Sequence, residues 1–310
     1  MSFPLGRRAA AAGLGFALLA AACGGGAETT AQCDGGALCL NSLTRNGAPV
    51  DLLQAQQALP TGEATFTFGM VTKDGGLLTG GSPQVWIARN GTARPLGPFR
   101  ASFHQFTPDP EDKSPRSPLT GFYAAPVSIP SPGTWSVAAV ADVRGSRLVG
   151  SRSLNVTSEE GPARVGTKAI AVKTPVARND ADAKRICTRP PPDPMHYISL
   201  DEALKNGKPT VVNFGTPLLC EAQLCGPVVD EQLIVFEKIG PERANFIHVE
   251  RFPPGPDLRP DTNTLPPYWK KWGFATEPWT LVIDGNGIIR ARFEGPVVAA
   301  LIEDALKPLL

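Results

Sequence analysis

The chain has 310 residues, of which 42% are hydrophobic, so it carries enough apolar side chains to form a packed core. Lys and Arg number 30 against 29 Asp and Glu, which gives a formal net charge of +1. This balance excludes a dominant electrostatic surface for nucleic acid. A chain of this length is expected to hold about two domains once any segments outside the domains are removed.

The first 22 residues have the pattern of an export signal. Arg7 and Arg8 precede an apolar run over residues 9–22, which is shorter than the roughly 20 residues of a spanning helix. Cys23 follows and precedes three glycines, a pattern that resembles the lipobox of bacterial lipoproteins. We therefore expect a signal peptide, a lipid on Cys23, and a protein anchored in the cell envelope, at the outer face of the cytoplasmic membrane or in the periplasm. The alternative is ordinary cleavage near Ala22, which would release the protein.

Residues 23–58 are rich in Gly, Ala, Gln and Thr and show no sustained period, so we expect a lipidated flexible tether. Cys33 and Cys39 lie within it, and a local disulfide is one option for this pair. A zinc site is not expected there, because no His or further Cys lies nearby. With Cys23 lipidated, an odd number of cysteines remains, so at least one thiol is unpaired or pairs with another molecule.

Residues 59–157 contain short apolar runs separated by Gly, Pro, Asn and Asp. Alternation places Phe66, Phe68 and Met70 on one face of the first run. Strands are predicted at 63–70, 84–88, 121–125, 134–140 and 147–156. This pattern predicts an all-β sandwich, and its Pro-Gly-Thr-Trp turn resembles those of bacterial immunoglobulin-like modules. The proline-rich residues 107–118 are expected to form a mobile loop.

Residues 158–195 are expected to be a linker, and residues 196–310 follow a different pattern. An initial short helix precedes a strand at 209–214, a helix at 227–239, a strand at 245–250, a helix at 268–272, strands at 279–284 and 288–293, and a helix at 297–309. The helix between the first two strands makes them parallel. The last two strands form a hairpin about the turn at 285–287. The whole chain is therefore expected to combine an all-β domain with an α/β domain.

This order of elements resembles the thioredoxin fold. The apolar strand at 208–214 resembles the strand that leads to the thioredoxin redox loop, and Cys220 and Cys225 stand at the entry to the next helix. Pro278 resembles the cis-proline element of the family. More narrowly, the chain resembles exported bacterial thioredoxin-like lipoproteins with a Cys-x-x-x-x-Cys-Gly-Pro loop. The resemblance implies that Cys220 is the nucleophile, Cys225 resolves the mixed disulfide, and Pro278 aligns the substrate backbone.

The chain departs from the family pattern at three positions. Four residues separate Cys220 from Cys225, whereas thioredoxins have two. On a regular helix such a pair is about 7.5 Å apart along the axis. That exceeds the usual Cα limit of roughly 7 Å, so the disulfide closes only if Cys220 or the whole segment lies in a loop. Asn213 replaces a buried Asp that helps to move protons, and Leu219 replaces a Trp.

Two main hypotheses for function remain open. A thiol–disulfide oxidoreductase acting on exported proteins requires an exposed Cys220. A non-catalytic binding or scaffold lipoprotein would instead hold a buried structural disulfide, since a fold does not imply a function. Copper delivery, with the thiolates and one imidazole such as His248, is a third hypothesis, but the cysteine spacing does not match. The expected partners are the membrane and exported thiol or disulfide proteins, with no nucleic acid.

No cofactor and no metal site are expected from the motifs. His248 is interpreted as a packed strand residue, and His196 as a cap at the end of the linker. Cys187 is either a half-buried thiol or one half of a mixed disulfide. Glu250 is interpreted as a solvated strand end, with a proton relay as the alternative.

Overall fold

The computed structural model describes Cys33 and residues 38–108, 119–158, 161–221 and 223–310. The expected signal peptide, the lipidation site at Cys23, much of the tether and most of the loop at 107–118 lie outside the described residues. Within the part of the chain that is described, we find no helix long and apolar enough to span a membrane.

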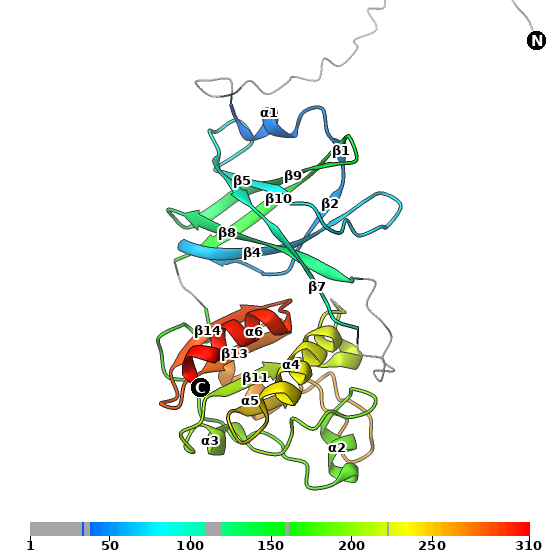
Figure 1. Ribbon diagram of the computed structural model, residues 1–310, viewed down its shortest axis with the longest axis vertical. Helices are drawn as coiled ribbons and strands as arrows, with labels where there is room; N and C mark the ends of the chain where they lie inside the picture. Colours follow the sequence, from blue (N-terminus) through cyan, green and yellow to red (C-terminus); the bar gives the residue numbers. More distant parts are fainter. Residues whose placement is uncertain (1–32, 34–37, 109–118, 159–160, 222) are drawn as a thin grey trace, which may run out of the picture. The chain divides into compact units, whose positions relative to one another are not determined.

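Two β-sheets form the first part of the described chain (Figure 1). The larger sheet has the order β1 (Ala48–Pro49), β10 (Ser146–Thr157), β9 (Gly133–Val143), β5 (Gln84–Ala88) and β6 (Leu96–Arg100), with β3 (Leu59–Pro60) also paired to β10. The smaller sheet has the order β2 (Asp51–Gln54), β4 (Gly62–Val71), β8 (Gly121–Ile129) and β7 (Ser102–Gln105). The short strands β1 and β3 run parallel to β10, and the other pairs are antiparallel.

The two sheets share one buried core. Phe66, Phe68 and Met70 of β4 are at most 1% exposed, which confirms the predicted alternation. They belong to the same core cluster as Val85 and Ile87 of β5, which lies in the other sheet. The sheets therefore pack face to face, with the apolar side of each turned inward.

The structure differs from the expected tether over residues 40–58. The helix α1 (Leu40–Thr44) follows the disulfide between Cys33 and Cys39, whose Cα atoms are 5.4 Å apart. Leu40 is buried against the larger sheet, and Leu52 of β2 lies in the sandwich core. Burial of these apolar side chains stabilises the segment as part of the β-domain, so the folded region begins earlier than the composition indicates.

A third sheet, of four strands, organises the rest of the described chain. Its order is β12 (Asn245–Val249), β11 (Thr210–Phe214), β13 (Trp279–Ile283) and β14 (Ile289–Glu294). Strands β11 and β12 are parallel, whereas β13 is antiparallel to β11 and β14 to β13. The helices are α3 (Leu200–Ala203), α4 (Cys225–Ile239), α5 (Pro267–Trp272) and α6 (Ala299–Leu306), with short 3₁₀ helices η1 (Pro217–Leu219) and η2 (Lys307–Leu309). The order of elements, the parallel strands β11 and β12 and the β13–β14 hairpin are those that the sequence predicts.

Helices cover both faces of this sheet. Val211 of β11 packs in a cluster with residues of α4 and α6, which lie side by side (Figure 1). The next residue, Val212, points to the opposite face and packs with residues of α3 and α5, as does Phe214. Alternating side chains of β11 thus pack into two cores, one on each face of the sheet. This explains why every residue of β11 is buried.

The segment predicted as a linker packs on this second domain from residue 163 onward. Ala163 and Val172 belong to the core cluster of α3 and α5. Arg189 forms a buried ion pair with Asp230 of α4, with Nε 2.9 Å from Oδ1. The segment also contains a helix, α2 (Asp180–Ile186). Because apolar burial and a buried ion pair hold the segment in place, an extended linker over residues 158–195 is not what the structure shows.

Candidate functional site

Cys220 and Cys225 form a disulfide between β11 and α4. Their Cα atoms are 5.9 Å apart, within the usual range of about 4.4–6.8 Å. Cys220 has an extended backbone directly after η1, and α4 begins at Cys225. Cys220 therefore lies outside the helix, and this allows the disulfide to close across the four-residue spacer. The helix was expected to begin at Pro227, and it begins two residues earlier, at Cys225.

The first turn of α4 is directed at the sulfur of Cys220. The backbone N–H of Cys225 donates a hydrogen bond to Cys220 Sγ over 3.3 Å. Backbone N–H groups at a helix N-terminus have no partner within the helix and carry partial positive charge. No acidic side chain occupies this first turn to oppose that charge. The arrangement would stabilise a thiolate at Cys220 once the disulfide is reduced.

Access to the disulfide is restricted. Cys220 is 7% exposed and Cys225 is fully buried. The oxidoreductase hypothesis expected an exposed Cys220, so the structure departs from that expectation. Leu218, two residues before Cys220, is 49% exposed and leaves an apolar side chain in solvent beside the disulfide.

Gly215 lies between the disulfide and Pro278. A β-carbon at Gly215 would lie 3.3 Å from the β-carbons of both Cys225 and Pro278. The Glu277–Pro278 peptide bond is cis, and Pro278 is buried. The structure thus brings the three residues that the resemblance implied, Cys220, Cys225 and Pro278, around the end of β11.

Two polar side chains lie near this point. Asn213 is buried and donates from Nδ2 to Thr280 Oγ1 over 3.0 Å. Glu277 is titratable, and burial raises its pKa to about 7, although hydrogen bonds from Thr216 and the charge of Arg251 act in the opposite direction. Asn213 cannot carry a proton to or from a thiol, whereas Glu277 is a carboxyl group that changes charge near neutral pH.

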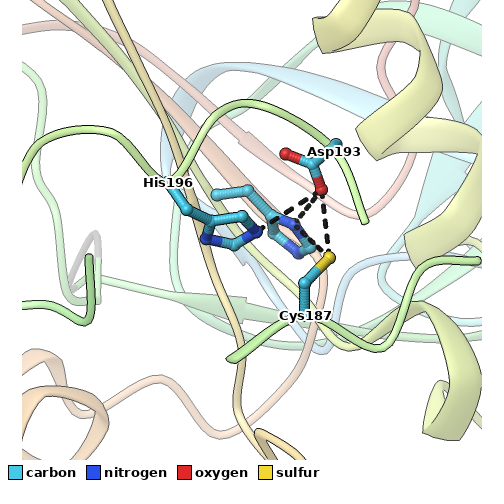
Figure 2. A group of neighbouring side chains, drawn as sticks. Cys187, Asp193 and His196 are labelled. Atoms are coloured by element: carbon cyan, nitrogen blue, oxygen red, sulfur yellow. Dashed lines mark hydrogen bonds and ion pairs between the residues drawn. The ribbon is translucent and has the colours of Figure 1, made fainter. Parts of the chain in front are cut away.

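A second group of reactive side chains is buried in the same domain (Figure 2). Cys187, Asp193 and His196 come from the segment before α3, and His248 comes from β12. Oδ2 of Asp193 lies 2.8 Å from His248 Nδ1, 3.3 Å from Cys187 Sγ and 3.5 Å from His196 Nε2. Each of the four is at most 4% exposed. We call these residues the Cys–Asp–His–His cluster.

Backbone pairing explains why these residues meet. The N–H of His248 donates to the carbonyl oxygen of Met195 over 2.8 Å, which ties the segment to β12. Asp193 Oδ1 accepts the N–H of Met195 over 3.0 Å, so its other oxygen is free to face the cluster. Cys187 stands at the C-terminal end of α2.

The cluster corrects several interpretations made from the sequence. Cys187 is buried rather than half-buried, and it is not in a disulfide. His248 is a buried strand residue as expected, but its ring also contacts Asp193, and His196 contacts Asp193 rather than being a simple cap. Glu250 is 2% exposed and accepts hydrogen bonds from the backbone N–H and the Oγ1 of Thr188, so it is not a solvated strand end.

Charges within the cluster are strongly coupled. Burial and Asp193 act to raise the pKa of the Cys187 thiol, but the neighbouring His196 and His248 rings outweigh them and the pKa is lowered. Burial acts to lower the pKa of His196, but the Asp193 carboxylate outweighs it and raises the pKa to about 9. The Asp193 carboxylate likewise raises the pKa of His248, and without a metal ion these shifts favour a thiolate and a carboxylate facing two imidazolium rings.

The expectation of no metal site was drawn from motifs that do not include this cluster, whose four donor atoms all lie within 4.8 Å of one another. Motif reasoning missed the cluster because its members are separated by up to 61 residues and no two are neighbours. The signal available in the sequence was the presence of Cys187, Asp193 and His196 within ten residues. With His248, the cluster uses two of the three histidines of the chain. Only the pairing of the segment with β12 brings His248 to the other three.

No model of a protein family matches the chain, and no curated protein matches it. Similar solved structures include a secreted thiol–disulfide isomerase from Corynebacterium glutamicum, at 18% identity and a TM-score of 0.28 over 36% of this chain and 75% of that one. A thiol:disulfide interchange protein of the thioredoxin family from Chlorobium tepidum matches at 18% identity and a TM-score of 0.26, over 46% and 99%. The Lin-41 filamin domain matches at 12% identity and a TM-score of 0.19, over 33% and 83%. Identities and TM-scores this low do not assign the chain to a family.

Proposed function

We propose that the chain is an extracytoplasmic, thioredoxin-like thiol–disulfide oxidoreductase that acts on exported proteins. The observation that carries this proposal is the hydrogen bond from the Cys225 N–H, at the start of α4, to Cys220 Sγ. A helix N-terminus aimed at one sulfur of a disulfide favours that sulfur as a thiolate, which is the nucleophile of thiol–disulfide exchange.

The reaction proceeds by two exchanges of sulfur partners. In the reduced protein, the Cys220 thiolate attacks a substrate disulfide, forms a mixed disulfide and releases one substrate thiolate. Cys225 then loses its proton and attacks Cys220 Sγ, which restores the Cys220–Cys225 disulfide and releases the second substrate thiolate. Two electrons pass from the dithiol to the substrate. The exposed Leu218 offers an apolar contact for a substrate chain, and Pro278 is the residue that aligns its backbone.

Thiol trapping across glutathione buffers tests this proposal. The wild-type disulfide should open and re-form reversibly, and Cys220→Ser should abolish exchange with a model disulfide substrate. A double Cys33→Ser, Cys39→Ser variant is the matched control, because it removes the other disulfide of the structure and should retain the exchange activity. Unchanged exchange in Cys220→Ser would refute the proposal.

The restricted access to Cys220 favours a second candidate, a non-catalytic binding or scaffold protein with a structural disulfide. In that case the native disulfide resists reduction by glutathione and reacts only after unfolding. Trapping the native and the unfolded protein in parallel separates the two candidates.

The cellular setting forms part of the same proposal. The apolar run before Cys23 supports export and lipid anchoring in the cell envelope. The face-to-face sheets of the first domain support an immunoglobulin-like module. Such a module would hold the redox domain away from the membrane surface.

A further inference from the structure

We infer that the Cys–Asp–His–His cluster is a binding site for a transition-metal ion, and that zinc fits it best. The site is formed by Cys187 Sγ, Asp193 Oδ2, His196 Nε2 and His248 Nδ1, and it is separate from the Cys220–Cys225 disulfide. The inference therefore does not depend on the proposed redox activity.

The ligand atoms are close enough together to hold one tetrahedral ion after small side-chain movements. Zinc bonds to Cys, His and carboxylate ligands are about 2.0–2.3 Å long, so two ligands of one tetrahedral ion lie roughly 3.3–3.7 Å apart. The four candidate ligand atoms all lie within 4.8 Å of one another. Asp193 Oδ2 is 3.3 Å from Cys187 Sγ and 3.5 Å from His196 Nε2, and Cys187 Sγ is 4.0 Å from His248 Nδ1. On binding, Asp193 Oδ2 and His248 Nδ1, now 2.8 Å apart, would separate, and the longest distances would shorten by about an ångström.

The hydrogen bond on the far side of His248 fixes which ring nitrogen faces the cluster as an acceptor. His248 Nε2 lies 2.9 Å from the carbonyl oxygen of Gly215, which can only accept, so Nε2 carries a proton. In a neutral ring, Nδ1 then directs a lone pair at the Asp193 carboxylate, 2.8 Å away. Two acceptors in contact need a positive charge between them, which either a proton on Nδ1 or a metal ion supplies. A backbone carbonyl on the outer nitrogen is also the usual second contact of a metal-bound histidine.

His196 supplies an independent observation. Its Nε2 atom is buried and has no hydrogen-bond partner among the described residues. This nitrogen faces the Asp193 carboxylate at 3.5 Å, a distance that is long for a hydrogen bond and ordinary for two ligands of one ion. A metal ion would satisfy His196 and His248 together.

The donor set selects the class of metal and its role. One thiolate, two imidazoles and one carboxylate suit zinc, whereas calcium and magnesium prefer oxygen ligands. All four positions are filled by buried protein side chains, which is typical of structural zinc sites rather than catalytic ones. The ion would fasten the segment that carries Cys187, Asp193 and His196 to strand β12.

Zinc content of the full chain tests this inference. The measurement is made in a Cys220→Ser, Cys225→Ser background, which removes the dithiol as a competing ligand. We expect about one zinc ion per chain after dialysis against metal-free buffer. His196→Gln and Cys187→Ala should each lower the zinc content at least about tenfold. His104→Gln is the matched control, because His104 lies in β7 outside the cluster, and it should retain the zinc.

Cobalt provides a second readout that needs no change within the cluster. Cobalt bound at this site in the same background should show sulfur-to-metal charge-transfer absorption and the intense visible bands of a tetrahedral ion. The alternative is a cluster held by protons alone, in which His248 is an imidazolium paired with Asp193. Absence of zinc together with absence of these cobalt bands in the folded protein of this background would overturn the inference. Zinc retained by a folded Cys187→Ala variant would do the same.

Discussion

The Nε2–H group of His248 donates to the carbonyl oxygen of Gly215 over 2.9 Å, and this bond connects the two sites of the domain. On its other side, the same glycine packs against Cys225 and Pro278. One backbone position at the end of β11 therefore borders both the disulfide and the Cys–Asp–His–His cluster. A change in the position of Gly215 would therefore alter the packing at the disulfide and at the cluster.

Gly215→Ala should destabilise the protein by about 1–3 kcal/mol, because the new methyl group would lie 3.3 Å from two β-carbons and 3.2 Å from Asn213 Oδ1. Thermal unfolding measures the effect as a lower midpoint temperature. Gly69→Ala is the matched control, since its β-carbon would meet Leu77 Cδ1 at 3.4 Å and Leu53 at 3.7 Å. Equal midpoints for Gly215→Ala and the wild type would contradict the close packing.

Glu277 should make the protein less stable as the pH rises from about 4.5 to about 7. Burial raises the pKa of Glu277 to about 7, so the folded state holds its proton more tightly than the unfolded state. The unfolding free energy then falls as the pH passes through this window and stays low above it. We expect Glu277→Gln to gain about 1–3 kcal/mol relative to the wild type between pH 5 and pH 8.

Urea unfolding at the two pH values measures this difference. Glu237→Gln in α4 serves as the control, because Glu237 is exposed and should show no such gain. A Glu277→Gln variant that follows the wild-type pH dependence would show that Glu277 does not keep its proton in the folded protein.

Limited proteolysis should cut the chain near residues 158–162 rather than throughout 158–190. From Ala163 onward the segment contributes to the core, and the buried Arg189–Asp230 ion pair holds its later part. Mass spectrometry of the early fragments should find a C-terminal fragment that begins before residue 163. Early cuts between residues 165 and 190 would instead support the extended linker that was expected from the sequence.

Cys23→Ala should release the protein from the membrane. The prediction rests on the sequence, in which an apolar run ends at Cys23 and three glycines follow. Fractionation of cells that express the wild type and the variant, with immunodetection, gives the result directly. The same soluble fraction for both proteins would rule out the anchor.

Sequence reasoning succeeded where the pattern is local. Phe66 and Phe68 alternate with polar residues and form a strand, and Cys220 and Cys225 fall between a buried strand and a helix as expected. The short strands β1, β3 and β7 have two to four residues each, too few to show a period.

The cluster could not be predicted because its geometry depends on a contact between distant parts of the chain. His248 stands between the apolar residues Ile247 and Val249 of strand β12. Nothing in the neighbouring sequence indicates that it contacts Cys187. The packing of residues 163–195 was missed for a related reason. Its buried residues, such as Val172, are too widely spaced to form a helical or strand pattern.

The position of the cluster along the chain also sets an order of assembly. Three of its members are synthesised before strand β11, and His248 follows more than fifty residues after His196. They can converge only after β12 has paired in parallel with β11, which is a contact between distant residues and therefore a late event in folding. Until then Cys187 is an accessible thiol on a chain that must form two specific disulfides. Closure of the cluster would end that exposure and protect the native pairing from exchange.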